Sequence, residues 1–114
     1  MNNLIKFLII SLLGFLSVIS QSQAQYPEKP ITMVIPLGPG GSHDLNARVF
    51  TSIVPQYLGN AIIVKLVPGA SGQTGTAMVA QAKPDGYTLL FTHNYIDQLQ
   101  QHVKKLPYNP LKDF

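Results

Sequence analysis

The chain runs Ile31-Thr-Met-Val-Ile-Pro36, then Leu-Gly-Pro-Gly-Gly-Ser-His-Asp44, and then Leu-Asn-Ala-Arg-Val-Phe50. The first segment is an apolar run of strand length, the second is a glycine-rich turn, and the third begins a helical pattern. Such a turn can aim unpaired backbone N–H groups beyond the end of the strand. The N-terminus of a helix also carries a partial positive charge that attracts anions. This stretch therefore predicts strand, tight loop and helix, with a candidate anion site at the loop.

The same order is repeated further along the chain. The repeat reads Ala61-Ile-Ile-Val-Lys-Leu-Val67, then Pro-Gly-Ala-Ser-Gly-Gln-Thr-Gly75, then Thr-Ala-Met-Val-Ala-Gln-Ala82. Ile62-Ile-Val64 is β-branched and unbroken, as in strands that are buried on both faces. Tyr87-Thr-Leu-Leu-Phe91 predicts a third strand, and a weaker helix follows near residues 96–103. This alternation predicts an α/β fold: a partial parallel sheet with flanking helices and right-handed crossovers.

The first helix has clear signals at both ends. Ser42 or Asp44 can cap its start, and Gly59 can close it. Pro55 removes a hydrogen-bond donor from the helix interior, so we expect a bend there, with a last loose turn over residues 56–58. The apolar residues that recur at helical spacing are Leu45, Val49, Phe50, Ile53 and Tyr57.

Composition restricts the classes of function. The 114 residues carry a formal net charge of +3 in scattered positions, so we expect no nucleic-acid partner. Cysteine is absent, which excludes disulfides and a lipid anchor on cysteine. Lys6, the apolar stretch Phe7–Ile19 and Ser22-Gln-Ala24 together predict a signal peptide over residues 1–24. The alternative is a membrane-tethered protein that retains this segment, although the stretch is shorter than the ~20 residues that span a bilayer.

Nucleotide and metal sites are poorly matched. Gly38 and Gly40 begin a dinucleotide-binding pattern, but His43 occupies the position of its third glycine. No cluster has the spacing that zinc requires, so we expect neither a metal nor another cofactor.

An enzyme is the alternative function. A hydrolase elbow needs Gly-x-Ser-x-Gly, and the turn around Ser71 misses this pattern by one place. The adjacent residues Ser42-His43-Asp44 are of the right types for a catalytic triad, but neighbouring side chains diverge. A small secreted α/β hydrolase using Ser71 or Ser42 remains the second hypothesis.

Backbone chemistry is what the two turns can offer together. Gly40 and Gly41 allow close approach of a ligand to the main chain, and Ser42 adds a hydroxyl. Asp44 can cap the helix or accept a hydrogen bond from a ligand. The second turn offers the N–H groups of Ala70, Ser71 and Gly72 and the Ser71 hydroxyl. Turn geometry alone explains the glycines of one loop, but two such loops at one sheet edge favour an anion site.

A series of segments carries a resemblance to a known family. They are Tyr26-Pro-Glu-Lys-Pro-Ile-Thr-Met-Val-Ile-Pro36, Pro39-Gly-Gly-Ser-His-Asp44, Pro68-Gly-Ala-Ser-Gly72, Pro84-Asp-Gly-Tyr-Thr-Leu-Leu90 and Leu106-Pro-Tyr-Asn-Pro-Leu-Lys-Asp-Phe114. In order and spacing, residues 25–114 resemble the start of the periplasmic solute receptors of tripartite tricarboxylate transporters, the Bug/TctC type. The resemblance implies a two-lobed flytrap (type II-like) that is not an enzyme. Such receptors capture small carboxylates, such as di- or tricarboxylates or acidic amino acids, and deliver them to the membrane permease subunits of the transporter.

The resemblance also implies a ligand site. It assigns a ligand carboxylate to main-chain N–H groups of two loops of the first lobe, with the turn after the third strand close by. The residues implied are Gly40, Gly41, Ser42, His43 and Asp44 in the first loop, Gly69, Ala70, Ser71 and Gly72 in the second, and Thr92, His93 and Asn94 in the turn.

On this interpretation, residues 25–114 form the N-terminal part of the first lobe of a periplasmic receptor that is a monomer at full length. We expect a fragment that lacks the rest of the receptor. One half-site leaves the carboxylate solvated, so we expect about millimolar affinity at best (about −4 kcal/mol).

Overall fold

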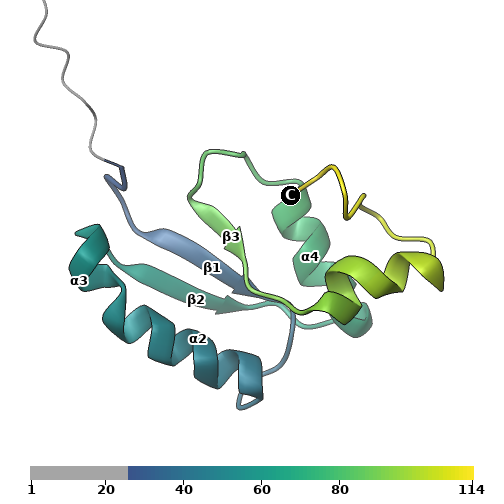
Figure 1. Ribbon diagram of the computed structural model, residues 1–114, viewed down its shortest axis with the longest axis horizontal. Helices are drawn as coiled ribbons and strands as arrows, with labels where there is room; N and C mark the ends of the chain where they lie inside the picture. Colours follow the sequence, from purple (N-terminus) through teal and green to yellow (C-terminus); the bar gives the residue numbers. More distant parts are fainter. Residues whose placement is uncertain (1–25) are drawn as a thin grey trace, which may run out of the picture.

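The computed structural model describes residues 26–114, in which helices flank a three-stranded sheet (Figure 1). The signal peptide predicted for residues 1–24 lies outside these residues. The elements are β1 (Ile31–Ile35), α2 (Ser42–Ile53), α3 (Pro55–Leu58), β2 (Ile62–Leu66), the 3₁₀ turn η2 (Ala70–Gly72), α4 (Gln73–Ala80), β3 (Thr88–Leu90), the π-helical turn η3 (Tyr95–Leu99) and the 3₁₀ turn η4 (Gln100–His102).

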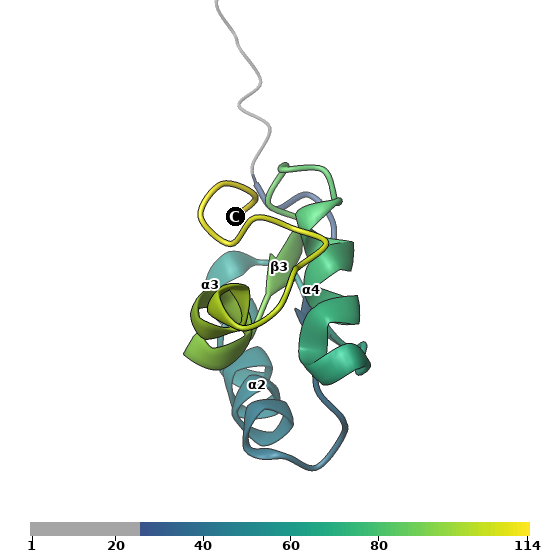
Figure 2. The same ribbon diagram turned by 90° about the vertical axis from the view of Figure 1, so that its right-hand side faces the viewer.

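The sheet has the order β2-β1-β3 and is parallel throughout, which confirms the predicted α/β fold. Ile35 at the end of β1 pairs with Leu66 at the end of β2, and Val34 pairs with Leu90 at the end of β3. The crossovers from β1 to β2 and from β2 to β3 run in opposite directions across the sheet. Right-handed connections then place their helices on opposite faces. Figure 2 shows α2 and α4 on opposite sides of the strands. Because both strand pairs are parallel, the carboxyl ends of all three strands lie at one edge of the sheet.

Strand burial follows from position in the sheet. β1 is central, and Val34 and Ile35 have no exposed surface, because helices cover both faces at this strand. The expectation that Ile62-Ile-Val64 is buried on both faces is wrong. In the described residues β2 is an edge strand whose burial alternates, with Ile62 buried and Ile63 54% exposed.

Neither predicted cap starts the first helix. Gly41 is the N-cap, its backbone is extended (φ −79°, ψ 170°), and no side chain caps the helix. Asp44 lies three residues after the cap, where its carboxylate reaches backwards instead. The predicted bend at Pro55 is confirmed, because α2 ends at Ile53 and Pro55 begins the separate turn α3. Gly59 closes α3 in the left-handed conformation (φ 73°), also as predicted.

The helical pattern predicted the helix but not the face that packs on the sheet. Ala47 has no exposed surface and joins the core of β1 and β2, and Val54 and Leu58 pack against that core. Small Ala47 lets α2 approach the strands closely. The residues that gave the pattern are 44–80% exposed: Leu45, Val49, Phe50, Ile53 and Tyr57.

The last two helices differ in their bounds from the prediction. α4 ends at Ala80 rather than Ala82, and the third helical segment begins at Tyr95 and is divided between η3 and η4. Within residues 26–114, no helix is both long and apolar enough to cross a membrane.

Candidate anion-binding site

Three connections meet at the carboxyl edge of the sheet. Loop 1 (residues 36–44, which include the first residues of α2) follows β1, loop 2 (residues 67–72) follows β2, and the third corner (residues 91–94) follows β3. In open parallel sheets, ligands bind outside the carboxyl ends of the strands, at the point where the connections diverge. The order β2-β1-β3 places this point at the end of β1. Loop 1 and loop 2 lie at the same edge of the sheet, as predicted, because β1 and β2 are parallel.

Side-chain contacts join the three connections. The ring of His43, at the start of α2, lies 4.9 Å from the ring of His93 and 5.9 Å from that of Phe91, measured between centroids. These contacts join loop 1 to the third corner. Loop 2 approaches loop 1 through Gly75 in α4, where an added Cβ would lie 2.6 Å from the Val67 carbonyl oxygen and 2.9 Å from Pro36 Cα.

Asp44 closes loop 1 from inside. Its Oδ2 accepts a hydrogen bond from the N–H of Gly40 (2.9 Å), and its Oδ1 pairs with Nε of Arg48 (2.8 Å). The carboxylate is buried, with Asp44 4% exposed. The hydrogen bond from Gly40, together with Arg48, lowers the pKa of Asp44 below its ordinary value of 3.8, although burial opposes the shift. Asp44 therefore does not cap the helix as predicted, and its carboxylate instead binds the backbone of loop 1.

This arrangement predicts an acid-sensitive contribution to stability. Because the pKa of Asp44 is lower in the folded than in the unfolded chain, its contribution is complete above pH 3.8. It is lost as the pH falls through the folded pKa. We expect Asp44→Asn to be less stable than the parent at pH 7 and to approach it as the pH falls below 3.8 through the lowered pKa of the folded chain, measured by urea unfolding. Asp85→Asn, at an exposed turn, controls for the loss of one negative charge. A constant difference from pH 7 to pH 2 would contradict the prediction.

Loop 1 leaves backbone donors unused at the start of α2. The N–H groups of Gly41, Ser42 and His43 make no hydrogen bond within residues 26–114. Gly41 and Ser42 are exposed, and His43 is half-buried. The N–H of Gly40 is not among these free donors, because it donates a hydrogen bond to the Asp44 carboxylate. Three consecutive free N–H groups at the end of a 12-residue helix form a site that favours an anion.

Loop 2 has an unusual backbone. Ala70 (φ 48°) and Ser71 (φ 55°) both adopt the left-handed conformation, which costs roughly 1–2 kcal/mol per residue other than glycine. The predicted donor at Gly72 is wrong, because its N–H donates to the carbonyl of Gly69 within the loop (2.9 Å). Ala70 and Ser71 are exposed residues, and their N–H groups have no acceptor in the described part of the chain. Loop 2 therefore offers two donors rather than three.

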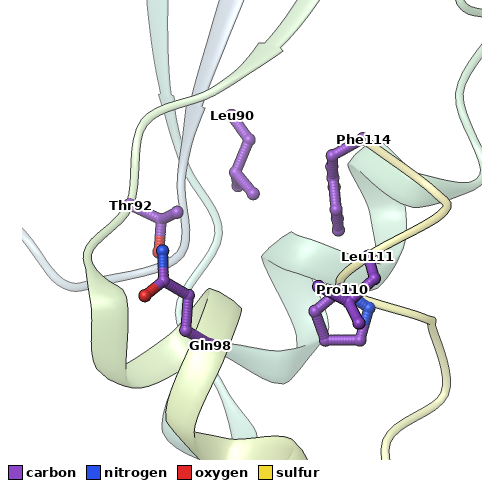
Figure 3. Close-up of a pocket in the computed structure, with 6 residues that line it drawn as sticks. All are labelled: Leu90, Thr92, Gln98, Pro110, Leu111 and Phe114. Carbon is purple, nitrogen blue, oxygen red and sulfur yellow. The ribbon is translucent and has the colours of Figure 1, made fainter.

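Neighbouring residues of the third corner face different parts of the molecule. His93 faces His43, whereas Thr92 lines a pocket of about 330 Å³ with Gln98 and Phe114 (Figure 3). Figure 3 shows the side chains of Thr92 and Gln98 pointing toward one another, and the Thr92 hydroxyl is buried without a hydrogen-bond partner in the described residues. This pocket contains no residue of loop 1 or loop 2. Asn94 is exposed at the start of η3.

Two residues behind loop 2 were missed by the sequence analysis. Gln100 has no exposed surface, and its Nε2 donates a hydrogen bond to the carbonyl oxygen of Ser71 (2.7 Å). Ile96, 1% exposed, fills the space where Gly72 lacks a side chain. Neither belongs to a motif, and only the return of η3 and η4 onto loop 2 brings them there. No signal in a single sequence could have identified them.

The chemistry of the site is that of neutral donors. Loop 1, loop 2 and the third corner contain no lysine or arginine, and Arg48 is paired with Asp44. No group of three or more metal-ligating side chains occurs in the part of the chain that the structure describes. Ser42 Oγ lies 3.4 Å from Nδ1 of His43, but the carboxylate of Asp44, which the triad hypothesis needs, is held by Gly40 and Arg48. The arrangement suits hydrogen bonding to an anion.

The chain is similar in sequence to a known family of transport receptors. The profile of the family described as "Tripartite tricarboxylate transporter family receptor" matches residues 46–114. A UPF0065 protein of Bordetella bronchiseptica is 40% identical over 107 residues, which are 93% of this chain and 32% of that protein.

Two solved structures are also similar. The first, MatC from Rhodopseudomonas palustris with bound malate, is 36% identical with a TM-score of 0.74, and the match covers 78% of this chain and 31% of MatC. The other, described as a periplasmic transporter, is 39% identical with a TM-score of 0.71, covering 76% of this chain and 30% of that one. The chain thus spans about a third of the length of the proteins that it matches. The family consists of receptors rather than enzymes. A third similar structure, 38% identical with a TM-score of 0.55 over 57% of this chain and 23% of that one, is described as a TctC solute binding protein from Polaromonas.

Proposed function

Because the chain belongs to the tripartite tricarboxylate transporter receptor family, we propose that it binds a small carboxylate through backbone N–H groups of loop 1 and loop 2. The first set comprises the N–H groups of Gly41, Ser42 and His43, and the second comprises those of Ala70 and Ser71. His93 lies beside His43 and forms part of the same surface. The residues whose backbone or side chain supports the two loops are Gly40, Asp44, Gly69 and Gly72.

The observation that carries the proposal is the set of free donors at the N-terminus of α2. The N–H groups of three consecutive exposed or half-buried residues have no acceptor in residues 26–114, and the helix adds its partial positive charge. A carboxylate accepts such hydrogen bonds with both oxygens. Hydrogen bonds to a charged group contribute about 1.5–3 kcal/mol each. Recognition without a lysine or arginine therefore remains energetically sufficient for a small anion.

The class of ligand follows from the family and from the related MatC, whose structure holds malate. A dicarboxylate can place one carboxylate at the free N–H groups and leave the other for groups elsewhere. We propose that the protein acts in the periplasm and delivers its ligand to the permease subunits of the transporter. An ester hydrolase is not supported, because the carboxylate of Asp44 is already paired inside loop 1.

The substitution Ser42→Pro tests the proposal by deleting one donor. Ser42 is the first residue of α2, where proline is favoured, and the extended backbone of Gly41 suits the residue before a proline. We expect the free energy of unfolding to change by less than about 0.5 kcal/mol. The affinity for malate should fall roughly 10- to 100-fold, the equivalent of one hydrogen bond to a charged group. Titration of ¹⁵N-labelled protein with malate, followed by NMR, measures both the affinity and the amides that respond.

Ser42→Ala is the matched control, because it removes the hydroxyl and keeps the N–H. If Ser42→Ala loses as much affinity as Ser42→Pro, the hydroxyl rather than the backbone binds the ligand. The proposal is wrong if millimolar malate shifts none of the amides of residues 41–43 and 70–71 in the parent chain.

A further inference from the structure

We infer that Gln100 is a positioning residue for ligand binding: its side-chain amide holds loop 2 in the left-handed conformation that presents the free N–H groups of Ala70 and Ser71. The inference deepens the proposed function and rests on it for the effect on affinity. The effect on the loop itself can be measured without a ligand.

The contact that supports this inference joins two distant segments. Gln100 lies in η4, and its Nε2 donates to the Ser71 carbonyl oxygen at 2.7 Å, across 29 positions of sequence. Its side chain is fully buried, so water does not compete for this hydrogen bond. Fixing the Ser71 carbonyl fixes the peptide plane that follows Ser71. It therefore restricts the backbone dihedral angle ψ of Ser71 (38°).

Loop 2 needs such a restraint because its conformation is intrinsically unfavourable. Ala70 and Ser71 are consecutive non-glycine residues with positive φ, and neither has a glycine's freedom. Successive residues in one left-handed turn point their N–H groups in the same direction, as at the start of a helix. If Ala70 or Ser71 relaxed to the right-handed or extended region, this common direction would be lost. Hydrogen bonding by Gln100 opposes that relaxation.

The other half of the Gln100 amide indicates a role beyond stability. Its Oε1 is buried and has no donor in the described part of the chain. A buried carbonyl oxygen without a partner destabilises the fold, and an apolar side chain of similar length would avoid that cost. The position thus carries a polar group whose clear benefit is the single hydrogen bond to loop 2.

Gln100→Met tests the inference, because methionine has a similar length and no donor. In the parent chain, Ala70 and Ser71 should show the strong intraresidue HN–Hα NOE that marks positive φ. We expect this signal to be lost in Gln100→Met, while the melting temperature stays the same or rises. Gln101→Met is the matched control, because Gln101 donates to Gln98 within its own helical segment (2.9 Å). This control should keep the left-handed signal.

The affinity for malate should fall about tenfold in Gln100→Met and stay unchanged in Gln101→Met, because only the molecules with a correctly formed loop bind tightly. Adding Ala70→Gly should restore part of the lost affinity, since glycine adopts positive φ without penalty. A residue that only filled space would show no such coupling. A left-handed signal retained in Gln100→Met, or an absence of coupling to Ala70→Gly, would overturn the inference.

If Gln100→Met does not fold, Gln100→Asn provides the same comparison, because it keeps the amide but is one methylene too short to reach Ser71. If the proposed function itself is wrong, the experiments give a different result. In that case malate does not bind the parent chain at all, while the NOE comparison still decides whether Gln100 holds the loop.

Discussion

Gly75→Val should destabilise the protein by about 3 kcal/mol, a large share of the 5–15 kcal/mol that typically stabilises a small domain. Gly75 lies in α4 and is buried. A Cβ at this position would lie 2.6 Å from the Val67 carbonyl oxygen and 2.9 Å from both Cα and Cβ of Pro36. Two of these atoms are backbone, at the first residues of loop 1 and loop 2. They cannot move aside without displacing the ends of β1 and β2.

For Gly75→Ala, helix propensity and packing predict changes in stability of opposite sign. Helix propensity alone predicts that alanine stabilises α4 by about 1 kcal/mol relative to glycine. The contacts with Val67 and Pro36 predict destabilisation instead, and we expect them to dominate. Urea unfolding measures the difference, with Gly38→Ala as the control, because a Cβ at Gly38 meets no atom within 4 Å. A Gly75→Ala variant as stable as the parent would show that α4 does not press against the two loops.

Gly72→Ala should cost about 2–4 kcal/mol, an effect of similar size, for two separable reasons. Gly72 has a positive φ (92°), and its missing Cβ leaves space that Ile96 fills, so that an added Cβ would overlap Ile96 Cδ1. Ile96 is 1% exposed, so its side chain has little room to move. Gly59→Ala isolates the conformational part of the cost, about 1 kcal/mol, because φ is 73° there and no atom lies within 4 Å of an added Cβ.

The steric part can be tested by a double-mutant cycle with Ile96→Val. This substitution removes Cδ1, the atom nearest to the added Cβ, and costs about 0.5–1.5 kcal/mol by itself. We expect the double variant to be at least about 1 kcal/mol more stable than the sum of the single effects predicts. Strict additivity in thermal or urea unfolding would mean that Ile96 does not restrict loop 2.

Much of the fold could be predicted because its signals are local. The apolar run Ile31–Ile35, the β-branched residues from Ile62 and the glycine-rich turns between strand and helix each depend on neighbours in sequence. Pro55 and Gly59 act through their own backbone restrictions, and both predictions are confirmed. The predicted caps failed because Asp44 has two local options, the helix start or the loop before it. The structure shows that it bonds to Gly40 in the loop.

Burial was less predictable than secondary structure. Ala47 rather than Val49 faces the sheet, because the small side chain lets α2 pack closely on the strands. The spacing of apolar residues along the helix does not predict this close packing. The exposure of Ile63 likewise depends on β2 being an edge strand in the described residues. Both facts belong to the arrangement of the sheet rather than to the segments themselves.

The sequence by itself determined that two β–α corners with exposed N–H groups exist, because glycine, proline and hydrophobic periodicity act over a few residues. Only the tertiary structure decided which of those groups remain free. Asp44 uses the N–H of Gly40 and the turn of loop 2 uses that of Gly72, whereas Ser42 and Ser71 keep theirs. Tertiary structure also brought Gln100 behind Ser71 from 29 positions away. A hydrogen bond between distant segments depends on the path of the whole chain, and no local pattern encodes it.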